Sequence, residues 1–144
     1  MIDYLVLLEV ASKIRDIQNK LYKKISDETG VNYTALEIIA FLYNNEKINT
    51  AKEICELLNL KPNLVSFHVD KLVTDGFLVR ESVNGDRRKV KLKITEKCIP
   101  IGKYCNEIRK KIYEKLTENC TSEELDSFYN FILKLKKNTE DIII

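Results

Sequence analysis

Apolar side chains recur at steps of three and four residues along the first thirty positions. The repeat consists of Leu7, Val10, Ile14, Ile17 and Leu21. This spacing places the side chains on one stripe of a helix, and a narrow, long stripe is typical of a seam between packed helices. Gly30 is suited to end the helix, because glycine readily adopts the left-handed conformation found there. We therefore predict a packing helix over residues 1–30.

Three further helix starts are indicated by a threonine followed three residues later by a glutamate. In such a capping box, each side chain accepts a hydrogen bond from a backbone N–H group that the helix leaves unpaired. The three boxes are Thr34 with Glu37, Thr50 with Glu53, and Thr121 with Glu124. We expect a helix to begin at each of them.

A helix-turn-helix is predicted after the second box. The short helix that begins at Thr50 is followed by the turn 59–62, in which Pro62 suits the first turn of the next helix. That next helix stops near Gly76. Its inward side chains are Val65, Val69 and Leu72. Two helices joined by so few residues are typical of a helix-turn-helix.

Beyond Gly76 the pattern indicates a β-hairpin. Segments 77–80 and 90–94 flank Asn84-Gly85, and Asn-Gly between alternating runs is a strong hairpin signal. In the second segment apolar residues alternate with lysines. One face of that strand is therefore predicted to be buried and the other basic.

Two helices are predicted at the end of the chain. Thr95 is expected to cap a long helix whose apolar face consists of Cys98, Ile101, Cys105, Ile108 and Ile112. The last helix follows Thr121. Its apolar face consists of Leu125, Phe128, Ile132 and Leu135. Together with the first helix, these faces expose more apolar surface than a monomer of this size tolerates, so we predict a homodimer formed through the chain ends.

The net charge of +2 is unevenly distributed. Residues 61–97 hold nine Lys or Arg and five Asp or Glu, and within 86–93 there are five cations and one anion. A short basic patch of this kind attracts a polyanion. A lysine-rich edge strand that resists aggregation would have the same charge.

The order of helix-turn-helix and basic hairpin suits duplex DNA, because a helix fits the major groove and a hairpin tip can reach the minor groove. The candidate contacts on the second helix are Lys61, Asn63, Ser66, Phe67 and Lys71, with Asp70 on the same outward side. Their polar groups can meet base edges or phosphates, and Phe67 can contact a thymine methyl. Considered alone, this helix could equally be an ordinary amphipathic helix with its polar side in water.

The hairpin favours the interpretation that this segment binds DNA. Arg87 and Arg88 follow the turn directly, and a narrow minor groove attracts an inserted arginine. We interpret Asp86 as a carboxylate that holds Arg88 in position. Lys89 and Lys91, together with Lys93, can neutralise phosphates.

Segment 72–95 resembles the winged helix of the MarR family of bacterial and archaeal regulators. The wing signature of that family is Asp, any residue, Arg, five residues and Leu-Thr, and here the chain has Asp86-Arg87-Arg88, five residues and Ile94-Thr95. The run 75–80 and the helices at both ends of the chain also match the family's layout. The predicted fold is thus mainly α with a small β-hairpin wing: an N-terminal dimerisation helix (1–30), a winged helix-turn-helix DNA-binding domain (31–97) and C-terminal dimerisation helices (98–144).

The resemblance implies a homodimer whose first and last helices interlock, with each winged helix contacting half of a pseudo-palindrome. It also implies double-stranded DNA as a partner, and a repressor released by a small anionic or phenolic effector. This chain has Phe67 and His68 where members often carry polar residues, so their base preferences are not transferred. The expected effector pocket lies between the dimer helices and the DNA-binding domain (31–97), which we call the reading head. Candidate lining residues are Tyr4, Tyr22, Tyr33, Tyr43 and Tyr104, although aromatic residues at helical spacing more often belong to a core.

Enzymatic activity is not expected. His68 is the single histidine, it has no nearby acid, nucleophile or metal partner in the sequence, and there is no glycine-rich phosphate loop. We therefore expect no cofactor and no metal, and we place His68 on the helix surface or at the DNA. No apolar run approaches the roughly eighteen residues of a membrane span, and we predict a cytoplasmic protein.

Two other functions stay open. A winged helix can serve protein–protein contact alone, although such a module has no need of braced arginines at the hairpin tip. A redox sensor needs an exposed, reactive thiolate. Cys98 and Cys105 lie on an apolar helix face where burial leaves them inert, and Cys55, the first cysteine, lies outside the first helix, where the peroxide-sensing members of the family carry theirs.

Overall fold

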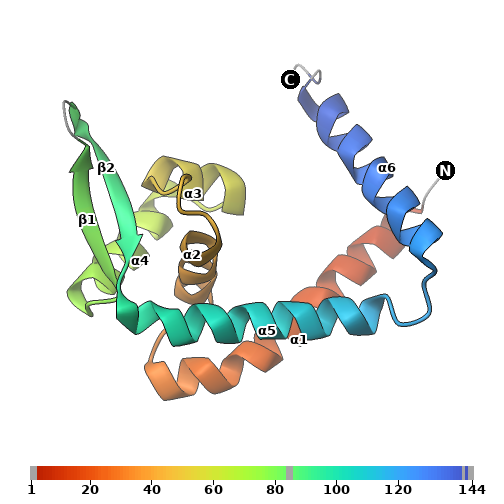
Figure 1. The fold of residues 1–144 in the computed structure, drawn as a ribbon, viewed down its shortest axis with the longest axis horizontal. Helices are drawn as coiled ribbons and strands as arrows, with labels where there is room; N and C mark the ends of the chain where they lie inside the picture. Colours follow the sequence, from red (N-terminus) through yellow and green to blue (C-terminus); the bar gives the residue numbers. More distant parts are fainter. Residues whose placement is uncertain (1–2, 84–85, 141, 143–144) are drawn as a thin grey trace. The chain divides into compact units, whose positions relative to one another are not determined.

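The computed structural model describes residues 3–83, 86–140 and 142. For residues 83–89 it does not describe the side chains. The chain forms two compact units, Met1–Lys110 and Lys111–Ile144. The first unit contains helices α1 to α4, the hairpin and the larger part of α5, as labelled in Figure 1. The fold predicted from the sequence, helices around a small winged helix-turn-helix, is confirmed.

Helix α1 (Tyr4–Thr29) ends where the sequence predicts. Gly30 adopts a left-handed conformation with φ of 70°, and its N–H donates to the carbonyl of Ser26. At the other end, the Asp3 side chain accepts a hydrogen bond from the N–H of Leu5 at 2.9 Å. The predicted stripe of α1 lies largely exposed, and only Tyr22 and Ile25 of this helix are buried.

Helix α2 (Tyr33–Asn44) begins earlier than the sequence predicts, and the capping box of Thr34 with Glu37 is wrong. The cap is Asn32, whose side-chain oxygen accepts from the N–H of Ala35 at 3.0 Å. Asn caps a helix as well as Thr does, and here it stands two residues after Gly30. Six residues of α2 are buried, so this helix forms the centre of the core.

Helices α3 (Ala51–Leu58) and α4 (Pro62–Thr74) form the predicted helix-turn-helix. The capping box of Thr50 with Glu53 is present in both directions, and Asn59 turns the chain with φ of 51°. Pro62 lies in the first turn of α4, where its missing N–H costs no hydrogen bond. Val65, Val69 and Leu72 are buried, as predicted.

The hairpin consists of β1 (Leu78–Val83) and β2 (Asp86–Ile94), which pair antiparallel from Leu78 opposite Ile94 to Ser82 opposite Val90. The buried face of β2 is shorter than the alternation predicts, because Leu92 is buried while Val90 is exposed. The N–H of Leu92 donates to the carbonyl of Asn49 at 2.8 Å, which attaches the hairpin to the loop before α3. Figure 1 shows the hairpin beside α4, and β2 also contacts α2.

Thr95 does not cap the long helix, so that prediction is wrong. Its hydroxyl donates to the carbonyls of Gly76 and Phe77, at 2.8 and 3.2 Å, because the end of β2 lies against the start of the hairpin. A short 3-10 turn, η1 (Glu96–Cys98), separates Thr95 from α5 (Ile99–Leu116). Thr95 therefore closes the base of the hairpin.

Helix α5 approaches α2 closely at Gly102. A Cβ atom at this position would lie 2.4 Å from the Tyr43 ring, at Cγ, so only glycine allows the two helices to approach so closely. Cys98, Ile101, Cys105 and Ile108 complete the core of the first unit.

The second unit contains α6 (Ser122–Glu140), which the predicted capping box opens. Thr121 donates from its N–H to the Glu124 carboxylate at 2.8 Å and accepts from the N–H of Glu124 at 3.2 Å. No residue of α6 is buried, so the helix carries an uncovered apolar face. None of the helices in the described part of the chain is long and apolar enough to span a membrane.

Candidate nucleic-acid interface

Helix α4 presents to solvent the face that the sequence predicts. The candidate contact residues Lys61, Asn63, Ser66, Phe67 and Lys71 are all exposed. Phe67 is 62% exposed, and its ring meets the His68 ring edge-on with the two centroids 5.2 Å apart. The exposed face therefore combines donors, a cation and one aromatic ring. It can contact a groove edge of DNA.

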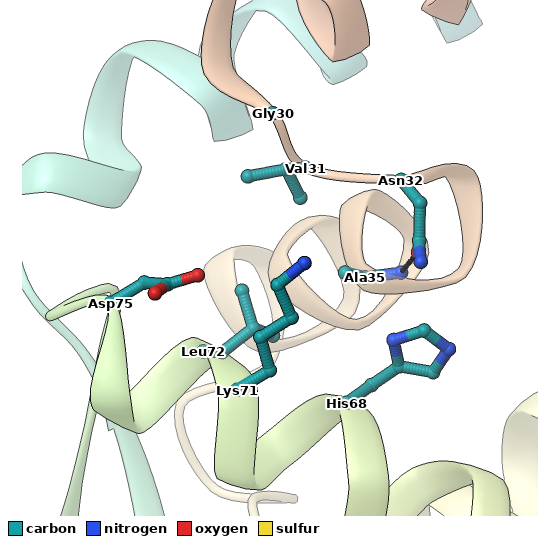
Figure 2. Close-up of a pocket in the computed structure, with 8 residues that line it drawn as sticks. All are labelled: Gly30, Val31, Asn32, Ala35, His68, Lys71, Leu72 and Asp75. Atoms are coloured by element: carbon teal, nitrogen blue, oxygen red, sulfur yellow. Dashed lines mark hydrogen bonds between the residues drawn. The ribbon is translucent and has the colours of Figure 1, made fainter.

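His68 is not on the helix surface, so the sequence prediction is wrong at this residue. It is 5% exposed, and its Nδ1 atom has no hydrogen-bond partner among the described residues. Figure 2 shows the ring turned toward Asn32 and Ala35 at the start of α2, with Lys71 nearby. Burial, and secondarily Lys71, lower the pKa of His68. A neutral imidazole therefore helps to pack α4 onto α2.

The hairpin residues are only partly within the described structure. Lys91 is exposed on β2. Lys93 is exposed too, but its ammonium lies 3.4 Å from the Glu81 carboxylate across the hairpin. Residues 86–89 belong to β2, whereas the side chains of Asp86, Arg87, Arg88 and Lys89 lie outside the described part. Their contact roles stay predictions.

A contact that the sequence analysis missed joins the hairpin to α4. The guanidinium of Arg80 on β1 binds the carboxylate of Asp70 on the outward side of α4. The sequence placed Asp70 on that side and gave Arg80 no role. A pair ten residues apart on a helix and a strand leaves no periodic signal.

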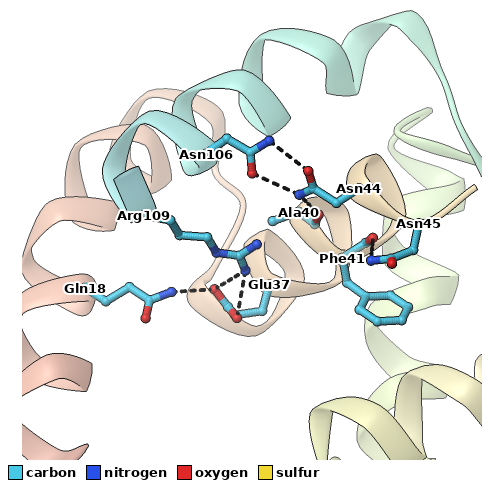
Figure 3. Close-up of polar contacts among 8 residues, drawn as sticks. All are labelled: Gln18, Glu37, Ala40, Phe41, Asn44, Asn45, Asn106 and Arg109. Atoms are coloured by element: carbon cyan, nitrogen blue, oxygen red, sulfur yellow. Dashed lines mark hydrogen bonds and ion pairs between the residues drawn. The ribbon is translucent and has the colours of Figure 1, made fainter. Parts of the chain in front are cut away.

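A polar cluster joins α2 to α1 and α5 (Figure 3). The carboxylate of Glu37 lies 3.3 Å from the Arg109 guanidinium and accepts a hydrogen bond from Gln18 at 2.8 Å. One turn away along α5, the side-chain amides of Asn44 and Asn106 pair at 2.9 Å. This cluster explains why Glu37 does not serve as a capping residue, and it anchors the reading head on α5.

A cavity of about 420 Å³ lies between α1, the start of α2 and the turn of the helix-turn-helix. Its lining includes Arg15, Tyr33 and Glu37, with Leu58, Asn59 and Leu60 from the turn. Of the five candidate tyrosines, Tyr33 lines this cavity, whereas Tyr22 is buried and Tyr4 is exposed. Tyr43 packs against Gly102, and Tyr104 donates to the carbonyl of Leu21 at 3.4 Å.

The cysteines differ in their surroundings. Cys98 and Cys105 are buried; burial raises the pKa of Cys98 to about 11 and also raises that of Cys105. Both thiols therefore stay protonated at neutral pH and are poor nucleophiles. Cys120 is exposed and Cys55 is partly exposed. In the described part of the chain, no three His, Cys, Asp or Glu residues come together as a metal site.

A family model described as MarR family matches residues 29–89, the segment from the end of α1 to the middle of β2. Residues 29–89 belong to the MarR family. This match confirms the resemblance seen at the hairpin, and MarR proteins are transcriptional regulators rather than enzymes. The matched segment is thus similar to a family of transcriptional regulators.

The similarity extends to individual proteins. The chain is 29% identical over 86 residues to the uncharacterized HTH-type transcriptional regulator YwhA of Bacillus subtilis (strain 168); the match covers 60% of this chain and 62% of that relative. A MarR family regulator from Listeria monocytogenes, solved with 26mer DNA, superposes with a TM-score of 0.81 at 16% identity, covering 98% of this chain and 91% of the other. The S. aureus MepR–DNA complex superposes with a TM-score of 0.74 at 16% identity, covering 95% of this chain and 96% of the other. The MarR architecture thus extends beyond the matched segment.

Proposed function

We propose that this MarR-type chain represses transcription by binding a pseudo-palindromic operator as a homodimer. The observation that carries the proposal is the exposed polar face of α4 beside a hairpin with a basic second strand. A helix of this kind enters the major groove, and the hairpin reaches the neighbouring minor groove. Two structures of similar fold contain DNA, which supports the same use of the fold here.

The proposed DNA contacts fall into two groups. On α4, base edges and phosphates are contacted by Lys61, Asn63, Ser66, Phe67 and Lys71. On the hairpin, Arg88 enters the minor groove with Asp86 as its brace and Arg87 beside it in the sequence, and Lys89 and Lys91 meet phosphates. The division follows from chemistry, since phosphate contacts position a protein while base contacts give specificity.

The homodimer is supported by uncovered apolar faces on helices at both ends of the chain. On α1, Leu7, Val10 and Ile17 are exposed, and on α6, Phe128 and Ile132 are exposed. Several large apolar side chains exposed on one helix mark an interaction site. Two copies related by a two-fold axis present two copies of α4 to an inverted repeat.

The cavity beside Arg15 is a proposed effector site for a small anionic or phenolic molecule. Arg15 can bind a carboxylate, and the ring of Tyr33 can cover an aromatic ligand. Because Leu58 at the end of α3 and Leu60 in the following turn line the same cavity, we expect a ligand there to displace α4 from its DNA-binding position. We expect 2-hydroxybenzoate to release bound DNA from the wild-type protein and to have no such effect on Arg15→Ala.

Selection from random duplex DNA tests the function. Two-fold symmetry requires an inverted repeat whose half-site centres lie about 10 bp, or a multiple of that, apart. A winged helix used only for protein contact would instead bind all duplexes with non-specific dissociation constants of about 10⁻⁴–10⁻⁶ M. Recovery of a single unrepeated site would contradict the symmetric dimer.

A further inference from the structure

We propose that the ion pair between Asp70 and Arg80 sets the position of the hairpin relative to α4, and with it the preference for base pairs flanking the operator core. The inference rests on the proposed function and assigns a positioning role to two residues within it. Neither residue is among the proposed DNA contacts.

The pair is exposed, so its role is not explained by stability. The side chains of Arg80 and Asp70 are 43% and 62% exposed, and ion pairs in such surroundings contribute little to folding. The pair does provide a direct bond between α4 and the hairpin. Arg80 carries a planar guanidinium, which holds a carboxylate in a defined geometry.

The hairpin is attached to the loop before α3 by the bond from the Leu92 N–H to the Asn49 carbonyl, and to the core at its base. There Thr95 bonds to the carbonyls of Gly76 and Phe77. Above the base, a largely apolar cavity of about 490 Å³ separates the hairpin from α3 and α4, and Arg80 itself lines it together with Val69 and Val90. Beside this cavity, the ion pair of Arg80 with Asp70 joins β1 directly to α4.

Because of its position along β1, the ion pair can affect where the far end of the hairpin lies. Arg80 stands opposite Leu92, two residues above the pair Leu78–Ile94 at the base. The end of β1 at Val83 lies three residues further, about 10 Å at the usual strand rise. A small rotation at Arg80 thus moves the far end of the hairpin by a larger distance, toward or away from the flanking groove.

Electrostatics gives a second reason for the pairing. An isolated carboxylate at Asp70, on the face proposed to meet DNA, would be repelled by phosphates whatever the sequence. Arg80 neutralises that charge. Two hypotheses therefore make opposite predictions: if Asp70 is only a repulsive charge, its removal strengthens binding to all DNA, and if it positions the hairpin, its removal weakens discrimination between flanks.

The test compares three duplexes: the one selected by the wild-type protein, the same duplex with shuffled flanks, and an unrelated duplex of equal length. Dissociation constants are measured at one fixed salt concentration. In Asp70→Ala we expect the affinity ratio of selected to flank-shuffled duplex to fall by about tenfold, the size of a single base-pair mismatch. Affinity for the unrelated duplex should stay the same or rise.

Glu81→Ala is the matched control. It removes the same charge from the hairpin and breaks the 3.4 Å ion pair with Lys93, which lies within the hairpin and does not reach α4. The ratio of selected to flank-shuffled duplex should stay at the wild-type value. The charge-reversed double variant Asp70→Arg with Arg80→Asp rebuilds the pair, and it should recover most of the lost ratio.

Three results would overturn the proposal: equal strengthening of binding to all three duplexes by Asp70→Ala, the same loss of ratio in Glu81→Ala, or no recovery in the double variant. A measurement without DNA separates this failure from failure of the proposed function. Residual dipolar couplings of backbone amides in α4 and the hairpin report their relative orientation. Wild-type couplings in Asp70→Ala would refute the positioning role even if no operator were found.

Discussion

Neighbouring basic residues of the hairpin are expected to act on DNA in different ways. Arg88 occupies the arginine of the MarR wing signature, so Arg88→Ala should weaken binding by about 1–3 kcal/mol and reduce the preference for A·T-rich flanks. Lys91, exposed on the same strand, is proposed to meet a phosphate. Lys91→Ala should weaken binding to all sequences alike and lower the slope of log K against log salt by about one unit.

Asp86 separates this interpretation from simple charge attraction. Removing a negative charge near DNA should strengthen binding if the hairpin is only a cationic patch. If Asp86 orders Arg88, Asp86→Ala should weaken binding instead, because the freed arginine loses up to about 2 kcal/mol of side-chain entropy on docking. Binding isotherms at two salt concentrations decide between these outcomes, and tighter binding by Asp86→Ala would contradict the brace.

His68 should make folding of the reading head sensitive to mild acid. Burial lowers its pKa from the ordinary value of 6.5, so the unfolded chain binds the proton more readily than the folded chain. Stability is then highest above about pH 6.5 and falls as the pH drops toward the folded-state pKa. In His68→Leu this part of the pH dependence should be absent, as measured by urea unfolding between pH 7.5 and 5.5. Equal slopes in both proteins would show that His68 is not the titrating group.

At the scale of helices, the caps offer a direct comparison between what the sequence indicates and what the structure uses. Thr50→Ala should lower the free energy of unfolding by about 1 kcal/mol, since its hydroxyl caps α3. Asn32→Ala should cost a similar amount at α2. Thr34→Ala is the control, because Thr34 stands inside α2 and caps nothing. If Thr34→Ala lowered the free energy of unfolding as much as Asn32→Ala does, Thr34 would be the cap of α2, as the sequence predicts.

Helix order, the helix-turn-helix joint and the hairpin were predictable because each rests on local patterns. Periodicity, Pro62 and the Asn84-Gly85 signal act over a few residues, although residues 84 and 85 themselves lie outside the described part of the chain. In the box at Thr50, Glu53 bonds only a few residues away, to the N–H groups of Thr50 and Asn49. The box at Thr34 failed because Glu37 is drawn into long-range contacts with Arg109 and Gln18. Thr95 failed because its hydroxyl finds carbonyls eighteen and nineteen residues away. Local patterns do not report competition from distant partners.

The candidate site divides in the same way. The outward face of α4 followed from periodicity, and all five of its predicted residues are exposed. The burial of His68 did not follow from the periodicity of the sequence, because the width of the buried face of α4 depends on how α2 crosses it. The pair of Asp70 with Arg80 and the cluster around Glu37 need three-dimensional contacts. These missed contacts join α4 to the hairpin and α2 to α1 and α5.

For the whole molecule, the uncovered apolar faces lead to the prediction of a homodimer. Leu7 and Val10 on α1, and Phe128 and Phe131 on α6, are each more than 40% exposed, and apolar surface of this extent is seldom left open to water. Sedimentation should give about twice the chain mass of 16.8 kDa. Leu7→Glu and Phe128→Glu should shift the protein toward monomer, because a charge buried in an apolar interface loses its hydration.

Leu57→Glu is the matched control, since Leu57 is equally exposed but lies on α3 in the reading head. This variant should remain dimeric. The monomerising variants should keep their circular dichroism in the reading head yet lose affinity for the inverted repeat, because one copy of α4 contacts only half of it. Their affinity for a single half-site should approach that of the wild type. A wild-type protein that sediments as a monomer at micromolar concentration, while still preferring an inverted repeat, would require that the two copies meet only on DNA.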